Sequence, residues 1–541
     1  MISHDNIAYT ENGAVSYATA GKVLIDQFAH AGTAMNRPID AVFTDQEALW
    51  NENPEFALRF PFYLRMITRK VKLSEATKTG KVQKGAGLRD EAYKRLLWIA
   101  YNHPDVFERN IWLLPLVGSW KDVWSLLFLD VENGNLINRE IMYAVMVAAL
   151  EDDTQADLIR KYMPAICSNN RCFTKRARAM NALAKEFASF LGLRPEEYRK
   201  MKASGCAHDF QKIICSQAYE KLNWANIPGK ALSSITSGKF LDNHGLVEDY
   251  LKWVMSQPVV KFNGYPYELG MKLSAKKNSN FLSPSMAATL YTINKQFDNL
   301  IETAKSDGDG LKGNVLCAID TSGSMSAEIC GGPKGLTSFD VCVSLGIYFA
   351  TLNEGAFHNT VAMFDDKSTI KKISGTFSDK WQQIMKEKTA WGSTNVLSLV
   401  EMLVRYRQEF PDVPIEDYPQ TLLIVSDMQF NPSGRRSYRS ETEETNYEAM
   451  KEILRTAFPD EWVDGLKIVW WYCAGREEAS RDVPATMDAP GMYLVSGFDG
   501  SIVSLLLKTK VDEKTGAVRS LTMEESVLEA LSQDVFSFIR S

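Results

Sequence analysis

The chain has 541 residues, more than one hydrophobic core usually supports, so two or three domains are expected. Its composition, 45% hydrophobic and 24% charged, is that of a globular protein and excludes disorder along the whole chain. The net charge of −6 excludes a surface that is basic throughout, but residues 1–310 carry 38 basic and 34 acidic side chains, and the other 231 residues carry 23 and 33. The N-terminal part could therefore bind a polyanion, whereas the C-terminal part would repel one.

Cysteine usage and hydropathy predict a cytoplasmic protein with no membrane partner. The eight cysteines form no Cys-x-x-Cys pair and no Cys/His ligand spacing, which favours reduced thiols. No basic-then-apolar leader follows Met1, and no apolar run reaches the roughly 20 residues that a bilayer crossing needs.

Residues 1–50 show only weak periodicity, and residues 1–54 form an N-terminal segment of no assigned structure. From 55 to 305 the pattern predicts short amphipathic helices joined by turns, which is typical of an all-α helical-repeat (HEAT-like) stack. The predicted helical stretches are 61–67, 93–100, 105–114, 121–128, 139–150, 174–190, 195–201, 210–222 and 246–255.

A polar, glycine-rich segment at 306–310 predicts a linker, and a domain of alternating strands and helices is expected over 311–508. Apolar runs at 314–319, 361–364, 421–425, 468–473 and 492–495 predict buried parallel strands. Helical patterns lie between and after them at 339–353, 396–410, 447–458 and 502–507, so we expect an α/β doubly wound sheet. Residues 509–541 form a C-terminal tail with an expected helix at 524–539.

Oxygen-bearing side chains follow two of these strands and precede one helix. Asp320, Ser322 and Ser324 come directly after the first strand, Thr394 opens a helix, and Asp427 follows the strand 421–425. Because the carboxyl ends of parallel strands meet at one edge of a sheet, these residues are expected to converge there. Carboxylates and hydroxyls are hard donors suited to Mg²⁺ or Mn²⁺. The alternative is that Asp320-Thr-Ser-Gly-Ser324 is a simple turn; a nucleotide-binding loop is disfavoured because no GxxxxGK[ST] motif is present.

The pattern resembles the metal-ion-dependent adhesion site (MIDAS) of von Willebrand factor A domains, which has Asp-x-Ser-x-Ser, then a Thr, then an Asp in this order. A helical stack followed by such a domain also resembles the TROVE/Ro ribonucleoprotein architecture. Two segments, Trp391-Gly-Ser-Thr-Asn395 and Ser426-Asp-Met-Gln-Phe430, resemble the Trp-Gly-x-x-Thr and Ser-Asp-Met-x-Phe motifs of an uncharacterised TROVE-related family. Asn395 departs from that family's pattern, and residues 1–50 do not resemble any part of that pattern. The resemblance implies architecture more than activity.

Two basic stretches in the helical part could contact RNA. Residues 59–95 contain eleven basic and three acidic side chains, and residues 160–200 contain ten and three. In a Ro-like protein such residues would hold phosphates, although a solvated helix face explains a charge run equally well. The candidate RNA-binding residues are Arg171, Lys175, Arg176, Arg178, Lys70, Lys81 and Lys84.

These observations predict a non-enzymatic, metal-dependent binding protein. The leading hypothesis is a Ro-like ribonucleoprotein scaffold that binds structured or single-ended RNA. The alternative is a protein-interaction adaptor in which a partner's carboxylate completes the metal shell, with no RNA role. A metal-dependent hydrolase is disfavoured because no nucleophile or general base is paired with the candidate site in the sequence.

Overall fold

The computed structural model describes residues 7–33, 35–67, 85–167, 172–205, 209–237, 239–275, 283–307, 311, 313–387, 392–434, 444–473, 483–487, 489, 491–498, 500, 509–511 and 518–540. The chain forms two compact units, each assembled from segments that are distant in sequence. The sheet unit comprises Met1–Arg37 and Ile227–Glu529, and the helical unit comprises Pro38–Asn226 and Ala530–Ser541. The predicted combination of a helical region with an α/β region is confirmed.

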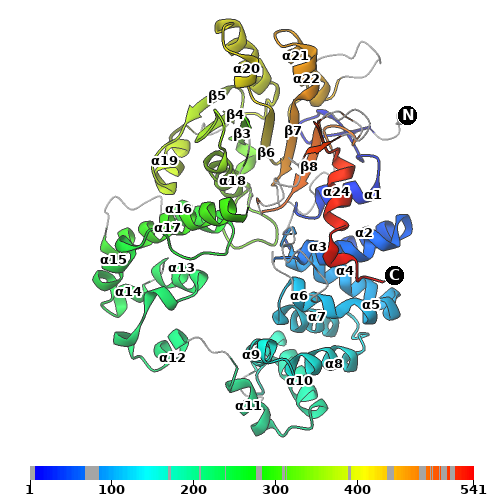
Figure 1. Cartoon of the computed structure of the whole chain (residues 1–541), viewed down its shortest axis with the longest axis vertical. Coiled ribbons are helices and arrows are strands. Elements are labelled where there is room, and N and C mark those ends of the chain that lie inside the picture. The colour runs from blue at the N-terminus through cyan, green and yellow to red at the C-terminus, as the bar shows by residue number, and fades with distance from the viewer. Residues whose placement is uncertain are drawn as a thin grey trace. The chain divides into compact units, whose positions relative to one another are not determined.

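The sheet unit is built around six strands in the order β5–β4–β3–β6–β7–β8 (Figure 1). Neighbouring strands are parallel except β4 and β5, which form an antiparallel pair. The strand order reverses at β3, and in such sheets ligands usually bind at the carboxyl ends of the strands where the order reverses. The strands are β3 (Val315–Asp320), β4 (Thr360–Phe364), β5 (Ser368–Lys372), β6 (Thr421–Ser426), β7 (Lys467–Tyr472) and β8 (Met492–Ser496).

All five predicted parallel strands are present, shifted by at most one residue at each end. The edge strand β5 was not predicted, because it is polar and only partly buried rather than a buried apolar run. The helices that connect the strands are α18 (Ser338–Leu352), α19 (Phe377–Glu387), α20 (Leu397–Glu409), α21 (Asn446–Arg455) and α22 (Asp460–Gly465).

Helix α18 packs closely on the centre of the sheet, against β3, β4 and β6. A Cβ at Gly346 would lie 2.5 Å from the Ile319 side chain, so a larger residue there would push α18 away from β3. Helix α20 packs on β4 and β5 and beside α21. The crossovers through α18 and α20 run in opposite directions along the sheet, so the two helices cover opposite faces (Figure 1).

The expected linker at 306–310 does not separate the two units. Helix α17 (Pro284–Asp307) enters it, and its Phe297 ring stacks on Phe377 of α19 with centroids 4.2 Å apart. Helix α16 (Pro266–Ser274) packs against α18 (Figure 1). These apolar contacts join α13 (Gly229–Ser237), α14 (Phe240–Asn243), α15 (Val247–Ser256), α16 and α17 to the sheet unit, so the boundary lies after Asn226 rather than near residue 305.

Residues 1–54, which had no assigned structure, are divided between the units. Strands β1 (Ile7–Tyr9) and β2 (Val15–Tyr17) form an antiparallel hairpin in the sheet unit, and α1 (Val23–His30) packs on β8. Tyr17 and Val483 exchange two backbone hydrogen bonds of 2.9 and 2.8 Å. Helix α2 (Ile39–Glu52) opens the helical unit.

The helical unit is a succession of helices in which sequence neighbours such as α2, α3 and α4 pack on one another. Its described residues contain no strand. After α2 its helices are α3 (Pro54–Arg65), α4 (Arg89–Asn102), α5 (Pro104–Asn110), α6 (Leu114–Val117), α7 (Trp120–Asn133), α8 (Arg139–Leu150), α9 (Asp153–Tyr162), α10 (Lys175–Phe190), α11 (Pro195–Ala203) and α12 (Asp209–Cys215).

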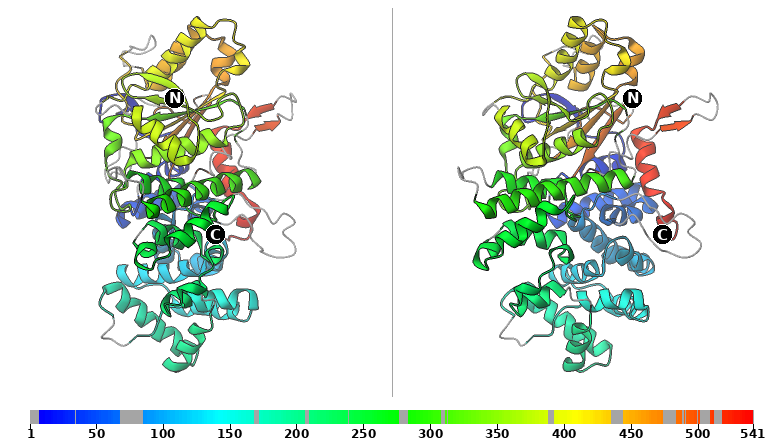
Figure 2. Two further views of the ribbon diagram at one scale, coloured as in Figure 1. Left: turned by 90° about the vertical axis from the view of Figure 1, so that its left-hand side faces the viewer. Right: turned by 60° about the vertical axis from the view of Figure 1, so that its left-hand side comes forward.

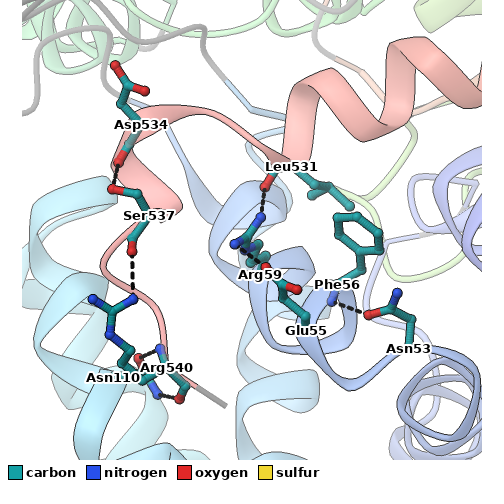
Figure 3. Close-up of polar contacts among 9 residues, drawn as sticks. All are labelled: Asn53, Glu55, Phe56, Arg59, Asn110, Leu531, Asp534, Ser537 and Arg540. Atoms are coloured by element: carbon teal, nitrogen blue, oxygen red, sulfur yellow. Dashed lines mark hydrogen bonds and ion pairs between the residues drawn. The ribbon is translucent and has the colours of Figure 1, made fainter.

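The C-terminal part contains an antiparallel pair, β9 (Thr509–Val511) and β10 (Val518–Ser520), shown as red arrows in Figure 2, and helix α24 (Met523–Leu531). The helix expected at 524–539 therefore ends at Leu531, and the one expected at 502–507 lies outside the described residues. The last residues belong to the helical unit. In Figure 3, Arg59 donates to the Leu531 carbonyl at 3.2 Å, and Asn110 and Arg540 exchange bonds of 2.7 and 2.9 Å.

Among the described helices, none combines the length and apolar character that a bilayer crossing requires.

Candidate metal centre

The candidate centre begins with Asp320, the last residue of β3. The preceding strand is buried throughout, and the β3–β6 register pairs Ile319 with Val425, so Asp320 lies level with Ser426. The Asp320 side chain is fully buried. Its Oδ1 accepts a 2.9 Å bond from the Ser322 backbone N–H, and its Oδ2 accepts a bond from the Ser426 hydroxyl. Neither donor is a cation, so these bonds leave the carboxylate's negative charge without a counter-ion.

The two serines of the loop after β3 lie with their hydroxyls together. Ser322 and Ser324 have their Oγ atoms 3.1 Å apart at the start of a short 3₁₀ turn, Gly323–Ser326. Ser322 is buried and Ser324 is half-buried. The loop therefore offers two hydroxyl oxygens beside Asp320, one of them reachable from solvent.

Thr394 lies on a loop that is hydrogen-bonded to both other ligand loops. The Gly392 carbonyl accepts a 3.2 Å bond from Gly323 N–H, and the Thr394 carbonyl accepts a 2.9 Å bond from Asn431 N–H. A Cβ at Gly392 would lie 2.5 Å from Cβ of Asp365, so this close approach requires glycine. The Thr394 side chain is buried.

The loop that carries Asp427 has an unusual backbone. Met428 adopts φ of +60°, a left-handed conformation that non-glycine residues rarely adopt. Its N–H donates to the Ser426 hydroxyl at 3.0 Å, and the next N–H, of Gln429, donates to Asp427 Oδ1 at 3.2 Å. The strained turn thus fixes Ser426 and Asp427 together, and Asp427 is 3% exposed.

The electrostatics of the centre favour a cation. Burial, and after it the negative charge of Asp427, raise the pKa of Asp320 to about 7 against the opposing effect of the hydrogen bonds from Ser322 and Ser426. Two buried carboxylates that repel each other are stabilised when a cation or a proton lies between them.

The donor set is two carboxylates and three hydroxyls. Within the described residues, no group of three or more His, Cys, Asp and Glu side chains could share a metal ion. A set in which three of the five side chains are hydroxyls, as here, does not contain three such residues. It still suits Mg²⁺, which is commonly held by one or two carboxylates and keeps several waters. All five predicted ligands thus lie on three loops that are hydrogen-bonded to one another.

The candidate RNA-binding residues are only partly described. Lys175, Arg176 and Arg178 are exposed in the first turn of α10. Lys175 lies 3.4 Å from Glu132, and the Arg176 guanidinium lies 4.4 Å from the centroid of the Phe128 ring. The remaining four lie outside the described residues, namely Lys70, Lys81, Lys84 and Arg171.

Three of the basic side chains in residues 59–95 are buried in ion pairs rather than exposed on the surface. Arg65 is buried 2.7 Å from Asp122, Arg95 is buried 2.9 Å from Glu91, and Lys94 is buried 2.6 Å from Asp90. These three cations therefore neutralise acids in or beside the core of the helical unit. They are not available to a polyanion.

Two exposed cations that the sequence did not single out lie near Arg176. Burial lowers the pKa of Lys121, and the positive charges of Arg89 and Arg176 lower it further. Arg89, Lys121 and Arg176 begin helices α4, α7 and α10 or lie in their first turns. We call these three residues the basic cluster. Arg89 and Arg176 lie in the two different basic stretches and Lys121 lies in neither, so charge runs alone do not show that the three residues interact.

Two family descriptions match separate parts of the chain. Residues 10–222 match "Domain of unknown function (DUF2828)", and residues 314–535 match "Domain of unknown function (DUF7788)". An uncharacterized protein of Acanthamoeba polyphaga mimivirus is 23% identical over 532 residues, covering 93% of this chain and 85% of the viral protein. The similarity to that protein therefore extends over both matched regions. All five candidate metal ligands lie in the second region.

Proposed function

We propose that the sheet unit is a von Willebrand factor A-type domain that binds Mg²⁺ or Mn²⁺ through Asp320, Ser322, Ser324, Thr394 and Asp427. The observation that carries the proposal is the pair of buried carboxylates, Asp320 and Asp427, at the point where the strand order reverses. A bound divalent cation would offset their repulsion, and the serine and threonine hydroxyls would complete part of an oxygen shell.

We infer that the role is binding rather than catalysis. The Asp320 carboxylate accepts bonds from the Ser322 N–H and the Ser426 hydroxyl, and a bound cation would engage that carboxylate, the hydroxyls of Ser322 and Ser324 and the carboxylate of Asp427. Ser324 is half-buried, so solvent reaches this side of the loop. An open coordination position of the cation there would accept an oxygen atom from another molecule. A protein ligand that donates an acidic side chain fits this position by charge and by ligand preference.

Calorimetric titration of the full chain with Mg²⁺ tests the metal site. Asp320→Ala should abolish binding while the circular dichroism spectrum stays unchanged. Asp412→Ala is the matched control, because Asp412 is an exposed carboxylate in the loop before β6, at the opposite end of that strand. Equal Mg²⁺ affinity in wild type and Asp320→Ala would refute the site.

A second role, RNA binding by the helical unit as in Ro-like proteins, is favoured by one observation. The positive charges of Arg89 and Arg176, from two other helices, act on Lys121, and the carboxylate of Asp122 lies 2.7 Å from buried Arg65 and 3.9 Å from Arg89. Such a surface would attract phosphates whatever the RNA sequence. We propose on this basis that the helical unit resembles the TROVE-type, HEAT-like stack and contacts structured or single-ended RNA. Filter binding of labelled RNA with and without EDTA separates this role from the metal site.

A further inference from the structure

The turn of the N-terminal hairpin contacts the loop of the candidate metal centre directly. Residues 10–14 join β1 to β2, and the turn is closed by Thr10 N–H to the Ala14 carbonyl at 2.9 Å and Ala14 N–H to Thr10 Oγ1 at 3.0 Å. Gly13 adopts φ of +86°, which the turn requires. The turn is therefore an ordered element with its own hydrogen bonds.

Three residues of the turn bind the strip of chain 429–431. The Thr10 hydroxyl donates to the Phe430 carbonyl at 2.8 Å. Glu11 N–H donates to Gln429 Oε1, and Asn12 Nδ2 donates to the Gln429 carbonyl, both at 2.6 Å. These bonds join residues more than 400 positions apart and fix both the backbone and the side chain of Gln429.

The strip in turn holds candidate ligands on two different loops. Gln429 N–H donates to Asp427 Oδ1, and Asn431 N–H donates to the Thr394 carbonyl. Asn431 Nδ2 also donates to Ser393 Oγ at 2.8 Å. Phe430, between them, is buried against Trp470 of β7 with ring centroids 5.4 Å apart. Any displacement of the strip would therefore move Asp427 and the Thr394 loop.

We propose that the turn 10–14 is a positioning element of the metal centre, in which Thr10 and Asn12 hold the strip 429–431 and thereby orient Asp427 and Thr394. This inference rests on the proposed metal-binding function. Groups that orient metal ligands by hydrogen bonds affect metal affinity without touching the ion. The turn lies in the region that matches one family description and the strip lies in the region that matches the other, so this contact links the two matched regions.

The test compares Mg²⁺ and Mn²⁺ affinity in the full chain and in the double variant Thr10→Val/Asn12→Ala. The variant removes the donors to Phe430 and Gln429 and keeps Asp427 and Thr394. We expect affinity to fall by about tenfold or more, as for other residues that orient ligands. The melting temperature without metal is measured in parallel. Tyr9→Ala, which alters an exposed side chain of the same hairpin, is the control and should keep wild-type affinity.

Conservative single variants separate positioning from general stability. Thr10→Ser keeps the hydroxyl donor and should bind metal as wild type does. Asn12→Asp keeps the shape but presents oxygen where Asn12 presents Nδ2, so it should bind more weakly even where its metal-free melting temperature is unchanged. These variants also give the answer if the double variant does not fold.

The outcomes are distinct. Wild-type binding with unchanged affinity in both the double variant and Asn12→Asp would overturn the positioning role and leave the metal site in place. A lower melting temperature with unchanged affinity would show that the turn only stabilises the fold, which also overturns the proposal. Absence of metal binding by the wild type would overturn the proposed function and this inference together.

Discussion

The Ser426 hydroxyl donates a hydrogen bond to Oδ2 of Asp320 across the β3–β6 pair, and both residues are fully buried. The same hydroxyl accepts the Met428 N–H that closes the strained turn behind Asp427. Ser426 is therefore the one side chain in the described loops that is hydrogen-bonded both to Asp320 and to the turn after Asp427.

Ser426→Ala should weaken Mg²⁺ binding, because Asp320 and the Met428 N–H are each left without this partner. We expect about tenfold lower affinity, and a decrease of about 1–3 kcal/mol in metal-free stability from the buried groups left unpaired. Ser426→Thr, which keeps the hydroxyl, is the matched comparison. Calorimetry and urea unfolding measure the two quantities, and unchanged affinity in Ser426→Ala would show that this hydroxyl does not orient Asp320.

Mg²⁺ binding should strengthen as pH rises from 6 to 8. The folded-state pKa of Asp320 is raised to about 7, whereas an unfolded Asp has a pKa of about 3.9. Between these values the folded state holds a proton that the unfolded state does not. The contribution of this group to metal-free stability is therefore fully present below pH of about 4 and is lost as pH rises through 7.

A cation replaces that proton, so the apparent affinity should be about tenfold higher at pH 8 than at pH 6, following the ionised fraction of Asp320. The increase in melting temperature on adding Mg²⁺, measured at both pH values, reports this competition. A metal effect that is the same at pH 6 and pH 8 would contradict a raised pKa for Asp320.

Asp122→Ala should destabilise the helical unit strongly. Asp122 is buried and pairs with Arg65, also buried, while accepting hydrogen bonds from Tyr93 and from the Ser119 N–H and hydroxyl. Removing it leaves the Arg65 charge uncompensated, at a cost of about 3–5 kcal/mol. Helical circular dichroism followed through a denaturant titration measures the decrease in stability. Asp105→Ala, at an exposed position in α5, should change stability little.

The convergence of the candidate metal ligands on one edge of the sheet could be predicted because each lies at the end of a recognisable element. Asp320 and Asp427 follow buried apolar strands, and Thr394 precedes a helix, so strand topology alone brings them to one edge. The contact between Thr10 and Phe430 could not be predicted, because a three-residue strand gives little periodicity and its partner lies 420 positions away.

The division of the chain into two compact units differs from the domain boundary predicted near residue 305, for a related reason. The glycine-rich composition of 306–310 indicates a linker locally, but stacking of Phe297 on Phe377 decides which unit α17 joins.

Composition is equally misleading for the basic stretch 59–95. The i, i+4 spacing of Glu91 and Arg95 is a signal of pairing within α4 that a count of charges does not include.

Asn110→Ala should release the C-terminal tail from the helical unit. Its side chain donates to the Arg540 carbonyl and accepts from the Arg540 N–H, so alanine removes both bonds (Figure 3). Each of these bonds contributes about 0.5–1.5 kcal/mol, and we expect faster removal of residues 532–541 by carboxypeptidase. Asn133→Ala, which removes only a local bond to the Leu129 carbonyl, is the control. Equal digestion rates in both variants would show that Asn110 does not anchor the tail.

RNA affinity should depend on the basic cluster. The positive charges of Arg89 and Arg176 repel that of Lys121 in the free protein, while Arg89 also lies 3.9 Å from Asp122, and a phosphate beside Lys121 would relieve the repulsion. Lys121→Glu/Arg176→Glu should weaken RNA binding at low salt. It should also flatten the log–log dependence of affinity on salt by roughly 0.7–0.9 for each phosphate that the variant no longer binds.

The control is Lys185→Glu, which also replaces a basic residue with an acidic one, at an exposed position further along α10. This variant should retain most of the affinity. Because the cluster belongs to the helical unit and the metal ligands to the sheet unit, Asp320→Ala should bind RNA as wild type does. If wild type binds no RNA at low salt, or if the cluster variant binds it as tightly as Lys185→Glu does, the basic cluster is a solvated surface and the metal-dependent adaptor role stands alone.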